Sequence, residues 1–400
     1  MIVAKDSMIE SGTTESAGRL TFQADLPHGL YYVKEVENKP GYLPNDEVYH
    51  LDASYTDPTL EVIELTCEVE NQPTITEFTK TDLTGGQEVE GAKLQILDKD
   101  GNVVEEWVSG KEPHTVYALA LGEYVLHEEQ APTEQGYVRA EDVTFIVEET
   151  GEVQKVEMKD DHTKVSISKT DITTGEEIEG AKLQILDKDG KVVEEWVSGE
   201  EHLIEYLPTG EYVLHEEQAP TEQGYVRAED VTFVVEETGE IQKVEMKDDY
   251  TKVSISKTDI TDGKEVQGAK LQIFDKDGKV VEEWTSGEEH LIEYLPTGEY
   301  TLHEEAAVDG YVVANEVAFT VKETGEIQKV EMKDERVMGV LKIHKTDGET
   351  GDNLEGVEFT LYEKESGKEV ASFVTDKDGN AESGQLPIGV YENGAFKEST

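Results

Sequence analysis

The sequence predicts an all-β protein in which one β-sandwich module is repeated along the chain. Three observations support this prediction. The chain repeats itself with a period of about 88 residues, each copy contains short runs of alternating apolar and polar residues, and turn signals separate those runs. No segment carries a convincing apolar stripe at helical spacing, so we expect strands throughout.

The repetition is clearest in the block that begins at Lys164, which is nearly restated from Lys252. A more divergent copy begins near Thr74. Equivalent lysines fall 89, 88 and 88 residues apart, at Lys80, Lys169, Lys257 and Lys345. A period of this length corresponds to a whole domain rather than to one unit of a solenoid.

Each copy contains the strand-like runs VSISK, AKLQILD, EYVLHE, VTFVVEE and QKVEMKD or close variants of them. Turn signals such as TTGE, DKDGK, LPTG and EETGE lie between these runs and indicate an antiparallel sandwich of about seven strands. We expect complete modules at residues 74–162, 163–250 and 251–336. Residues 1–73 match only the carboxy-terminal part of a module and residues 337–400 only the amino-terminal part, so the chain is expected to be cut from a longer protein.

The composition argues against several classes of partner. The chain has 91 acidic and 35 basic residues and a formal net charge of -56, which repels nucleic acid and anionic membrane surfaces. No apolar stretch is long enough to insert into a membrane, and the start of the chain lacks the regions of a secretion signal. The single cysteine, Cys67, excludes an intrachain disulfide and is expected to be a small buried hydrophobe.

The sequence contains no motif of a cofactor or metal enzyme. It has no GxSxG, HExxH or Walker-type loop, so we expect no multiple-turnover enzyme and no cofactor. The DKDG turn that begins at Asp98 and its equivalents resemble part of a calcium loop, but the other ligands are missing, so they are interpreted as hairpin turns without metal.

Three ionisable side chains in each repeat share strand parity with core residues. In the second repeat Lys169 alternates in phase with Val165 and Ile167, and Glu216 and Asp248 have equivalent places in later strands. The same parity selects Asp160 and Asp248 over the aspartates that follow them, unless a β-bulge shifts the phase. The inward-pointing sets are Lys80, Glu128 and Asp160; Lys169, Glu216 and Asp248; and Lys257, Glu304 and Asp334.

A buried lysine between two carboxyl groups has two interpretations. It is either a hydrogen-bonded ion pair, which seldom adds net stability, or a reactive pair. Desolvation favours a neutral lysine amine and a neutral carboxylic acid. The amine can then attack the carbonyl carbon of Asp while Glu transfers the proton, which forms an intramolecular isopeptide bond without a cofactor.

These motifs resemble the Cna B-type, or SpaA-like, domains of Gram-positive pilins and cell-wall-anchored adhesins. The resemblance is carried by KTD, GAKLQI, LPTGEYVLHEEQAPTEQGY and VEMKDD in that order, and it extends over essentially the whole chain. It implies an Ig-like, prealbumin-like sandwich with a Lys–Asp or Lys–Asn isopeptide bond assisted by Glu. On this basis Glu128, Glu216 and Glu304 are the assisting acids, although Asp is the less common acceptor in such domains.

The two ends of the chain contain partial sites. The amino-terminal segment has Glu35 and Asn71 in equivalent places but no matching lysine, and Lys5 is a poor substitute. The carboxy-terminal segment has Lys345 but no acceptor strand after it, and Glu398 is its uncertain acid partner. We therefore expect Lys345 to form no cross-link within this chain.

The leading functional hypothesis is a structural spacer on the cell wall of a Gram-positive bacterium, with its anchor and signal outside this segment. Its partners would be the neighbouring modules, and further candidates are other pilin subunits or host extracellular matrix. The main alternative is a set of adhesin modules that bind a host matrix protein or glycan, and a third is accessory modules of a secreted hydrolase. Near identity of the second and third repeats favours the spacer, because a specialised binding domain should differ from its neighbours.

Overall fold

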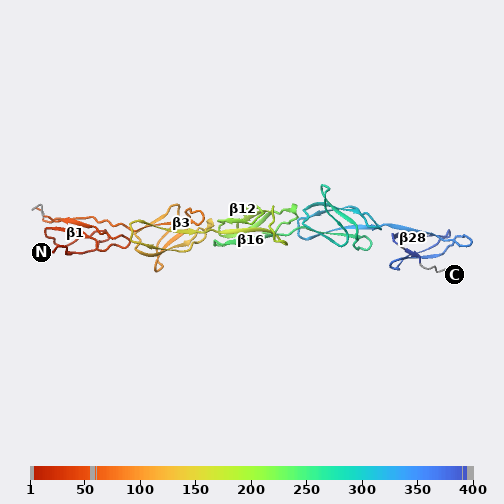
Figure 1. The fold of residues 1–400 in the computed structure, drawn as a ribbon, viewed down its shortest axis with the longest axis horizontal. Helices are drawn as coiled ribbons and strands as arrows, with labels where there is room; N and C mark the ends of the chain where they lie inside the picture. Colours follow the sequence, from red (N-terminus) through yellow and green to blue (C-terminus); the bar gives the residue numbers. More distant parts are fainter. Residues whose placement is uncertain (1–3, 55–58, 60, 390, 394–400) are drawn as a thin grey trace. The chain divides into compact units, whose positions relative to one another are not determined.

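A computed structural model describes residues 4–54, 59, 61–389 and 391–393 of the chain. These residues form β-strands and two short 3-10 helices, η1 (Thr133–Gln135) and η2 (Thr221–Gln223), so the predicted all-β class is confirmed (Figure 1). Neither helix has the length and apolar character that crossing a bilayer would require.

The contacts between residues divide the chain into two compact units. The first combines residues up to Val165 with the segments Ile204–Gly210 and Val234–Gln242. The second combines Ser166–Leu203, Glu211–Phe233 and the residues from Lys243 onward. The boundary therefore passes through the second repeat, and the segment Ile204–Gly210 belongs with the first repeat by its contacts.

The first repeat is a two-layer sandwich. One sheet has the order β6-β3-β9, and the other has the order β5-β4-β7-β8. The first and last strands of the repeat pair in parallel, with Lys80 opposite Met158 and Asp82 opposite Asp160. The strands are β3 (Ile75–Asp82), β4 (Lys93–Asp98), β5 (Val103–Val108), β6 (His114–Tyr117), β7 (Gly122–Gln130), β8 (Val143–Val147) and β9 (Val153–Asp160).

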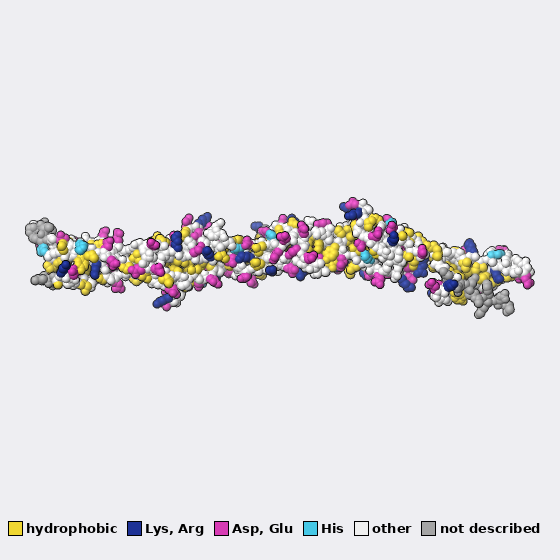
Figure 2. Space-filling model, in the orientation of Figure 1, with side chains coloured by type: hydrophobic (Ala, Val, Ile, Leu, Met, Phe, Trp, Pro, Cys, Tyr) yellow, Lys and Arg dark blue, Asp and Glu magenta, His cyan; other side chains and the backbone are white. Residues whose placement is uncertain are grey.

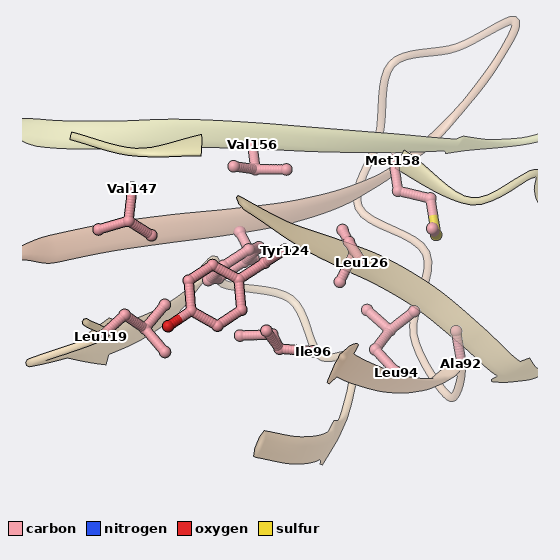
Figure 3. Packing of buried hydrophobic residues seen from close by; sticks show 10 residues of the cluster. Ala92, Leu94, Ile96, Leu119, Tyr124, Leu126, Val147, Val156 and Met158 are labelled. Atoms are coloured by element: carbon pink, nitrogen blue, oxygen red, sulfur yellow. The ribbon is translucent and has the colours of Figure 1, made fainter. Parts of the chain in front are cut away.

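The core of this sandwich forms where the inward residues of the two sheets meet. Figure 3 shows Val156 and Met158 of β9 directed toward Leu126 of β7 and Ile96 of β4. Phe78 of β3 belongs to the same cluster. The alternation of buried and partly exposed residues along β3 and β7 places every second side chain in this core, as strand geometry requires.

The second and third repeats have the same pair of sheets. In the second repeat they have the orders β13-β10-β16 and β12-β11-β14-β15, and in the third β20-β17-β24-β22 and β19-β18-β21-β23. The strands of the second repeat are β10 (Lys164–Asp171), β11 (Lys182–Leu186), β12 (Val192–Val197), β13 (His202–Glu205), β14 (Gly210–Gln218), β15 (Val231–Val235) and β16 (Ile241–Asp248). Those of the third are β17 (Lys252–Asp259), β18 (Lys270–Asp275), β19 (Val280–Thr285), β20 (His290–Glu293), β21 (Gly298–Ala306), β22 (Tyr311–Val312), β23 (Val317–Val321) and β24 (Ile327–Arg336).

The two ends of the chain form smaller sheets within the described residues. At the amino end β1 (Leu30–Lys34) pairs with β2 (Val48–Asp52). At the carboxy end β25 (Met338–His344) pairs with β28 (Asn380–Pro387), and β26 (Glu358–Glu363) lies between β27 (Glu369–Val374) and β29 (Tyr391–Asn393). β3 and β17 each pair in parallel with the last strand of their repeat. In the described part of the chain, β25 has no such parallel partner.

One sequence prediction about burial is wrong. Cys67 is exposed rather than buried. The prediction assumed that Cys67 lies in a strand covered by a second layer. Residues 61–72 form no strand in the structure, so the alternation of CEVEN does not place its side chains against a core.

Candidate functional site

The candidate site of the first repeat joins the two sheets through three buried side chains. Lys80 projects inward from β3, Asp160 ends the neighbouring strand β9, and Glu128 lies on β7 of the opposite sheet, where its backbone pairs with Leu94. Lys80 is 2% exposed, and both carboxyl groups have no exposed surface. The structure therefore brings together the three residues that strand parity selects.

The lysine amine contacts both acids. Lys80 Nζ donates a hydrogen bond to Asp160 Oδ1 and lies 3.0 Å from Glu128 Oε2. The same Glu128 oxygen accepts a hydrogen bond from the backbone N–H of Ala140 at 2.6 Å. This backbone contact fixes the orientation of the Glu128 carboxyl, and strand parity had no means of predicting it.

The second carboxyl oxygens are poorly satisfied in the ion-pair arrangement. Asp160 Oδ2 and Glu128 Oε1 are buried and accept no hydrogen bond from the described residues. A buried acceptor without a partner costs about 1–3 kcal/mol.

Electrostatics favour a neutral acceptor acid. Burial raises the pKa of Asp160 to about 7, Lys80 opposes the rise, and the Glu128 carboxyl adds to it. An acceptor with such a pKa keeps its proton at a pH at which an ordinary aspartate would have lost it. A protonated acid is the form from which hydroxide can leave as water.

The second and third repeats reproduce this arrangement. Lys169 Nζ contacts Asp248 Oδ1 and lies 2.9 Å from Glu216 Oε2, and Lys257 Nζ contacts Asp334 Oδ1 and lies 3.1 Å from Glu304 Oε1. Burial raises the pKa of Asp248 to about 7 and also raises that of Asp334. The amides of Ala228 and Ala314 also donate to the two glutamates, but in the third repeat the amide contacts Glu304 Oε2 while the lysine amine lies near Oε1.

The aspartates that parity rejected have other partners. Asp161 accepts a hydrogen bond from Lys164 Nζ at 2.7 Å, and Asp249 accepts one from Lys252 Nζ at 2.6 Å. The parallel register runs unbroken to Asp160 in the first repeat and to Asp334 in the third. Asp160 and Asp248, the first aspartates of the two pairs, are both fully buried.

The residues of the partial sites are less buried than those of the three complete sites. Asn71 Nδ2 donates to both carboxyl oxygens of Glu35 at 2.8 Å, and both residues are partly buried. Lys5 is exposed. Lys345 follows β25 and is partly buried, and Glu398 lies outside the described residues.

Sequence reasoning missed a second polar cluster beside the first site. Asp82, at the end of β3, is 5% exposed and accepts a hydrogen bond from Tyr206 of the second repeat at 2.8 Å. The repeated KTD motif was the available signal. Its Asp was not distinguished from the other acidic residues, because the partner is one repeat away in the sequence.

Comparisons with known proteins agree with the fold. The chain matches the SpaA family, a prealbumin-like fold domain, over residues 74–162, 163–250, 251–336 and 339–398. No curated protein matches it. Similar solved structures include the Bacillus anthracis TIE protein, with 24% identity and a TM-score of 0.41 over 81% of this chain and 69% of that one.

Two pilins are also similar to parts of the chain. The streptococcal ancillary pilin has 16% identity and a TM-score of 0.30 over 65% of this chain and 98% of that one. The major pilin BcpA of Bacillus cereus has 16% identity and a TM-score of 0.30 over 66% of this chain and 99% of that one. The resemblance inferred from the sequence motifs is thus confirmed by the family match, which covers most of the chain: this protein belongs to the SpaA family of prealbumin-like fold domains.

Proposed function

We propose that the chain is a stalk segment of a Gram-positive surface adhesin or pilin-like protein, in which each complete repeat is locked by a Lys–Asp isopeptide bond. The observation that carries the proposal is the threefold recurrence of a lysine that is 2% exposed and contacts two fully or almost fully buried acids across the sandwich. A buried ion pair is weak evidence for stability by itself. Here the same buried ion pair occurs in all three repeats, each time with acid oxygens that accept no hydrogen bond, and this recurrence favours a chemical use.

The proposed reaction is a condensation within each repeat. In the first repeat a proton moves from Lys80 to the paired acids, and the neutral Nζ attacks Cγ of protonated Asp160. Glu128 receives a proton from the attacking nitrogen and returns it to the departing oxygen. The Nζ–Cγ bond forms, a Cγ–O bond breaks, and one water leaves. No oxidant, reductant or cofactor is needed, because two fixed groups in a dry interior react at a very high effective concentration.

The surroundings of the site explain why the reaction would stay within the repeat. All three groups are inaccessible from outside, so neither external amines nor bulk water compete for the acceptor.

The outer surface of the protein is rich in acidic side chains. Figure 2 shows Asp and Glu side chains spread over the visible face rather than gathered in one patch. This distribution fits a spacer whose mutual repulsion keeps molecules apart, with neighbouring modules as its regular partners and a cell-surface location.

Intact mass spectrometry tests the proposal directly. The purified chain is expected to weigh less than its sequence by the mass of three water molecules. Lys80→Ala, Lys169→Ala and Lys257→Ala are each expected to restore one water, because each removes one nucleophile. An unchanged mass for the parent chain would contradict the proposed chemistry and leave three buried ion pairs.

The rate of cross-linking in the first two repeats is expected to fall as the pH rises above about 7. The acceptors Asp160 and Asp248 have pKa values raised to about 7, so they become carboxylates above that pH and resist attack. A neutral lysine amine with a protonated aspartic acid holds as many protons as a lysine ammonium with an aspartate carboxylate. A higher pH therefore does not increase the fraction of the neutral, reactive form relative to the ion pair. The measurement is the rate of water loss from freshly synthesised chain in buffers between about pH 6 and pH 9. A rate that climbs steadily over this range would contradict the expectation.

A further inference from the structure

A buried aspartate lies next to the candidate site in the first repeat. Asp82 is the last residue of β3, two positions after Lys80, and its backbone is the parallel partner of Asp160. The N–H of Leu83 donates to the carbonyl of Asp160 at 2.8 Å. The end of β3 and the end of β9 are therefore tied together at Asp82, close to the two atoms that are proposed to bond.

The side chain of Asp82 is held by partners from two repeats. Its Oδ1 accepts hydrogen bonds from the N–H of Thr84 at 2.7 Å and the N–H of Gly85 at 2.6 Å, which fixes the turn after β3. Its Oδ2 accepts a hydrogen bond from the hydroxyl of Tyr206 at 2.8 Å. Burial acts to raise the pKa of Asp82, but a hydrogen bond from the Thr84 hydroxyl to Oδ1 at 2.6 Å, together with the three bonds above, holds it below its usual value, so the group is an anion.

Tyr206 is placed firmly enough to act on that carboxylate. Its backbone has a φ of 60°, and its ring stacks on His162 with 3.9 Å between ring centroids. The backbone of Tyr206 lies against Gly136, where a Cβ would come within 2.3 Å of its carbonyl group. The N–H of Tyr206 donates to the carbonyl of Thr163 at 3.0 Å. All of these residues belong to the first compact unit.

The second repeat has the same cluster, which lies within the second compact unit. The hydroxyl of Tyr294, from the third repeat, donates to Asp171 Oδ2 at 2.7 Å, and its ring stacks on Tyr250 at 3.9 Å. Tyr294 also has a left-handed backbone, with a φ of 59°, and lies against Gly224. In both cases a tyrosine of the following repeat completes the hydrogen bonding of an aspartate beside the preceding site.

The third repeat completes its cluster with its own residues. Asp259 Oδ2 accepts hydrogen bonds from the hydroxyl of Tyr311 at 2.8 Å and from Arg336 Nε. Arg336 occupies the position that is His162 in the first repeat and Tyr250 in the second. Tyr206 is the residue directly before an LPxG motif. In the segment that follows the third repeat, the residue directly before the equivalent motif is Gln385 rather than tyrosine. The third cluster therefore needs no hydroxyl from beyond the repeat.

We propose that Tyr206 and Tyr294 are positioning residues for the isopeptide bond of the repeat that precedes their own, whereas the third repeat cross-links without such help. The inference rests on the proposed isopeptide function. Each tyrosine fixes an aspartate on the strand of the nucleophile and opposite the acceptor, and small errors in the alignment of two reacting groups strongly reduce rates.

The test follows bond formation separately in each repeat of the full chain. Freshly synthesised protein from a cell-free reaction is sampled over time and digested, and the cross-linked peptides of the three repeats are quantified by mass spectrometry. Tyr206→Phe keeps the ring and its stacking but removes the hydroxyl. It is expected to slow the Lys80–Asp160 bond by roughly tenfold or more, in line with the loss of one hydrogen bond to a charged group, and to leave the other two bonds unchanged.

Tyr294→Phe is the matched variant. It is expected to slow only the Lys169–Asp248 bond, and the double variant is expected to leave the third repeat at the parent rate. A merely structural role would give a different pattern, because each tyrosine lies in the repeat after the one it is proposed to assist. Slowing of the tyrosine's own repeat, or parent rates in all three repeats, would overturn this inference while the cross-links themselves still form. If the parent chain forms no cross-linked peptide, the proposed function fails together with it.

Discussion

Glu128→Gln is expected to slow cross-linking in the first repeat by at least about 100-fold, the usual contribution of a positioned general acid–base. Glutamine keeps the shape of the side chain and can still accept the hydrogen bond from the N–H of Ala140. It cannot take a proton from the amine of Lys80 and return it to the oxygen that leaves Asp160. The measurement is the intact mass of freshly purified protein, which should fall short of the mass calculated from the variant's own sequence by two waters instead of three.

Glu129→Gln is the matched control for that experiment. Glu129 is the next residue of β7, and its side chain is exposed and lies near His127. This control is expected to keep the full deficit of three waters relative to its own calculated mass. If Glu128→Gln cross-links at the parent rate, the glutamate is a structural partner of the lysine and has no part in proton transfer.

Lys80→Met is expected to let the first repeat lengthen by about 270 Å under tension, whereas the parent repeat should not unravel. The cross-link would join two residues separated by 80 positions, and an extended chain spans about 3.3–3.6 Å per residue. The first and last strands of the repeat are parallel neighbours, so a pulling force reaches the Lys80–Asp160 bond before it reaches the strands between them. Single-molecule force extension of the full chain measures the step.

The same variant should be less stable without force. By the loop-closure relation for covalent cross-links, a loop of this size contributes about 4.5 kcal/mol to the free energy of unfolding. Lys99→Met removes an exposed lysine from a turn and serves as the control, with no extra step and no loss of stability. A 270 Å step in the parent chain as well would show that no covalent bond bridges β3 and β9.

Strand parity was sufficient to predict which three residues of each repeat meet, because each residue lies in phase with the buried residues before it in its strand and both sheets have one buried face. Lys80, Glu128 and Asp160 all lie in strands whose alternation continues unbroken into the core. The same rule failed for Cys67, because alternation in the sequence has structural meaning only where a second layer covers the strand. The chain around Cys67 forms no strand, so its side-chain directions follow local turns instead.

The contacts that parity missed depend on the backbone rather than on side-chain type. Ala140 acts through its N–H group, which every residue except proline possesses, so nothing in its side chain marks it as a site residue. Tyr206 requires a left-handed backbone and the close approach of Gly136, and neither feature leaves a periodic pattern. Such positions become visible only when distant segments are placed together.

Every proposed Lys, Glu and Asp set is drawn from a single repeat, and this containment has an evolutionary consequence. In-frame duplication or loss of one period of the gene would add or remove a complete Lys, Glu and Asp set. No incomplete set would remain between the other repeats. Copy number can therefore drift between related genes while the chemistry is inherited intact. Only the contact with the tyrosine of the next repeat would depend on which repeat follows.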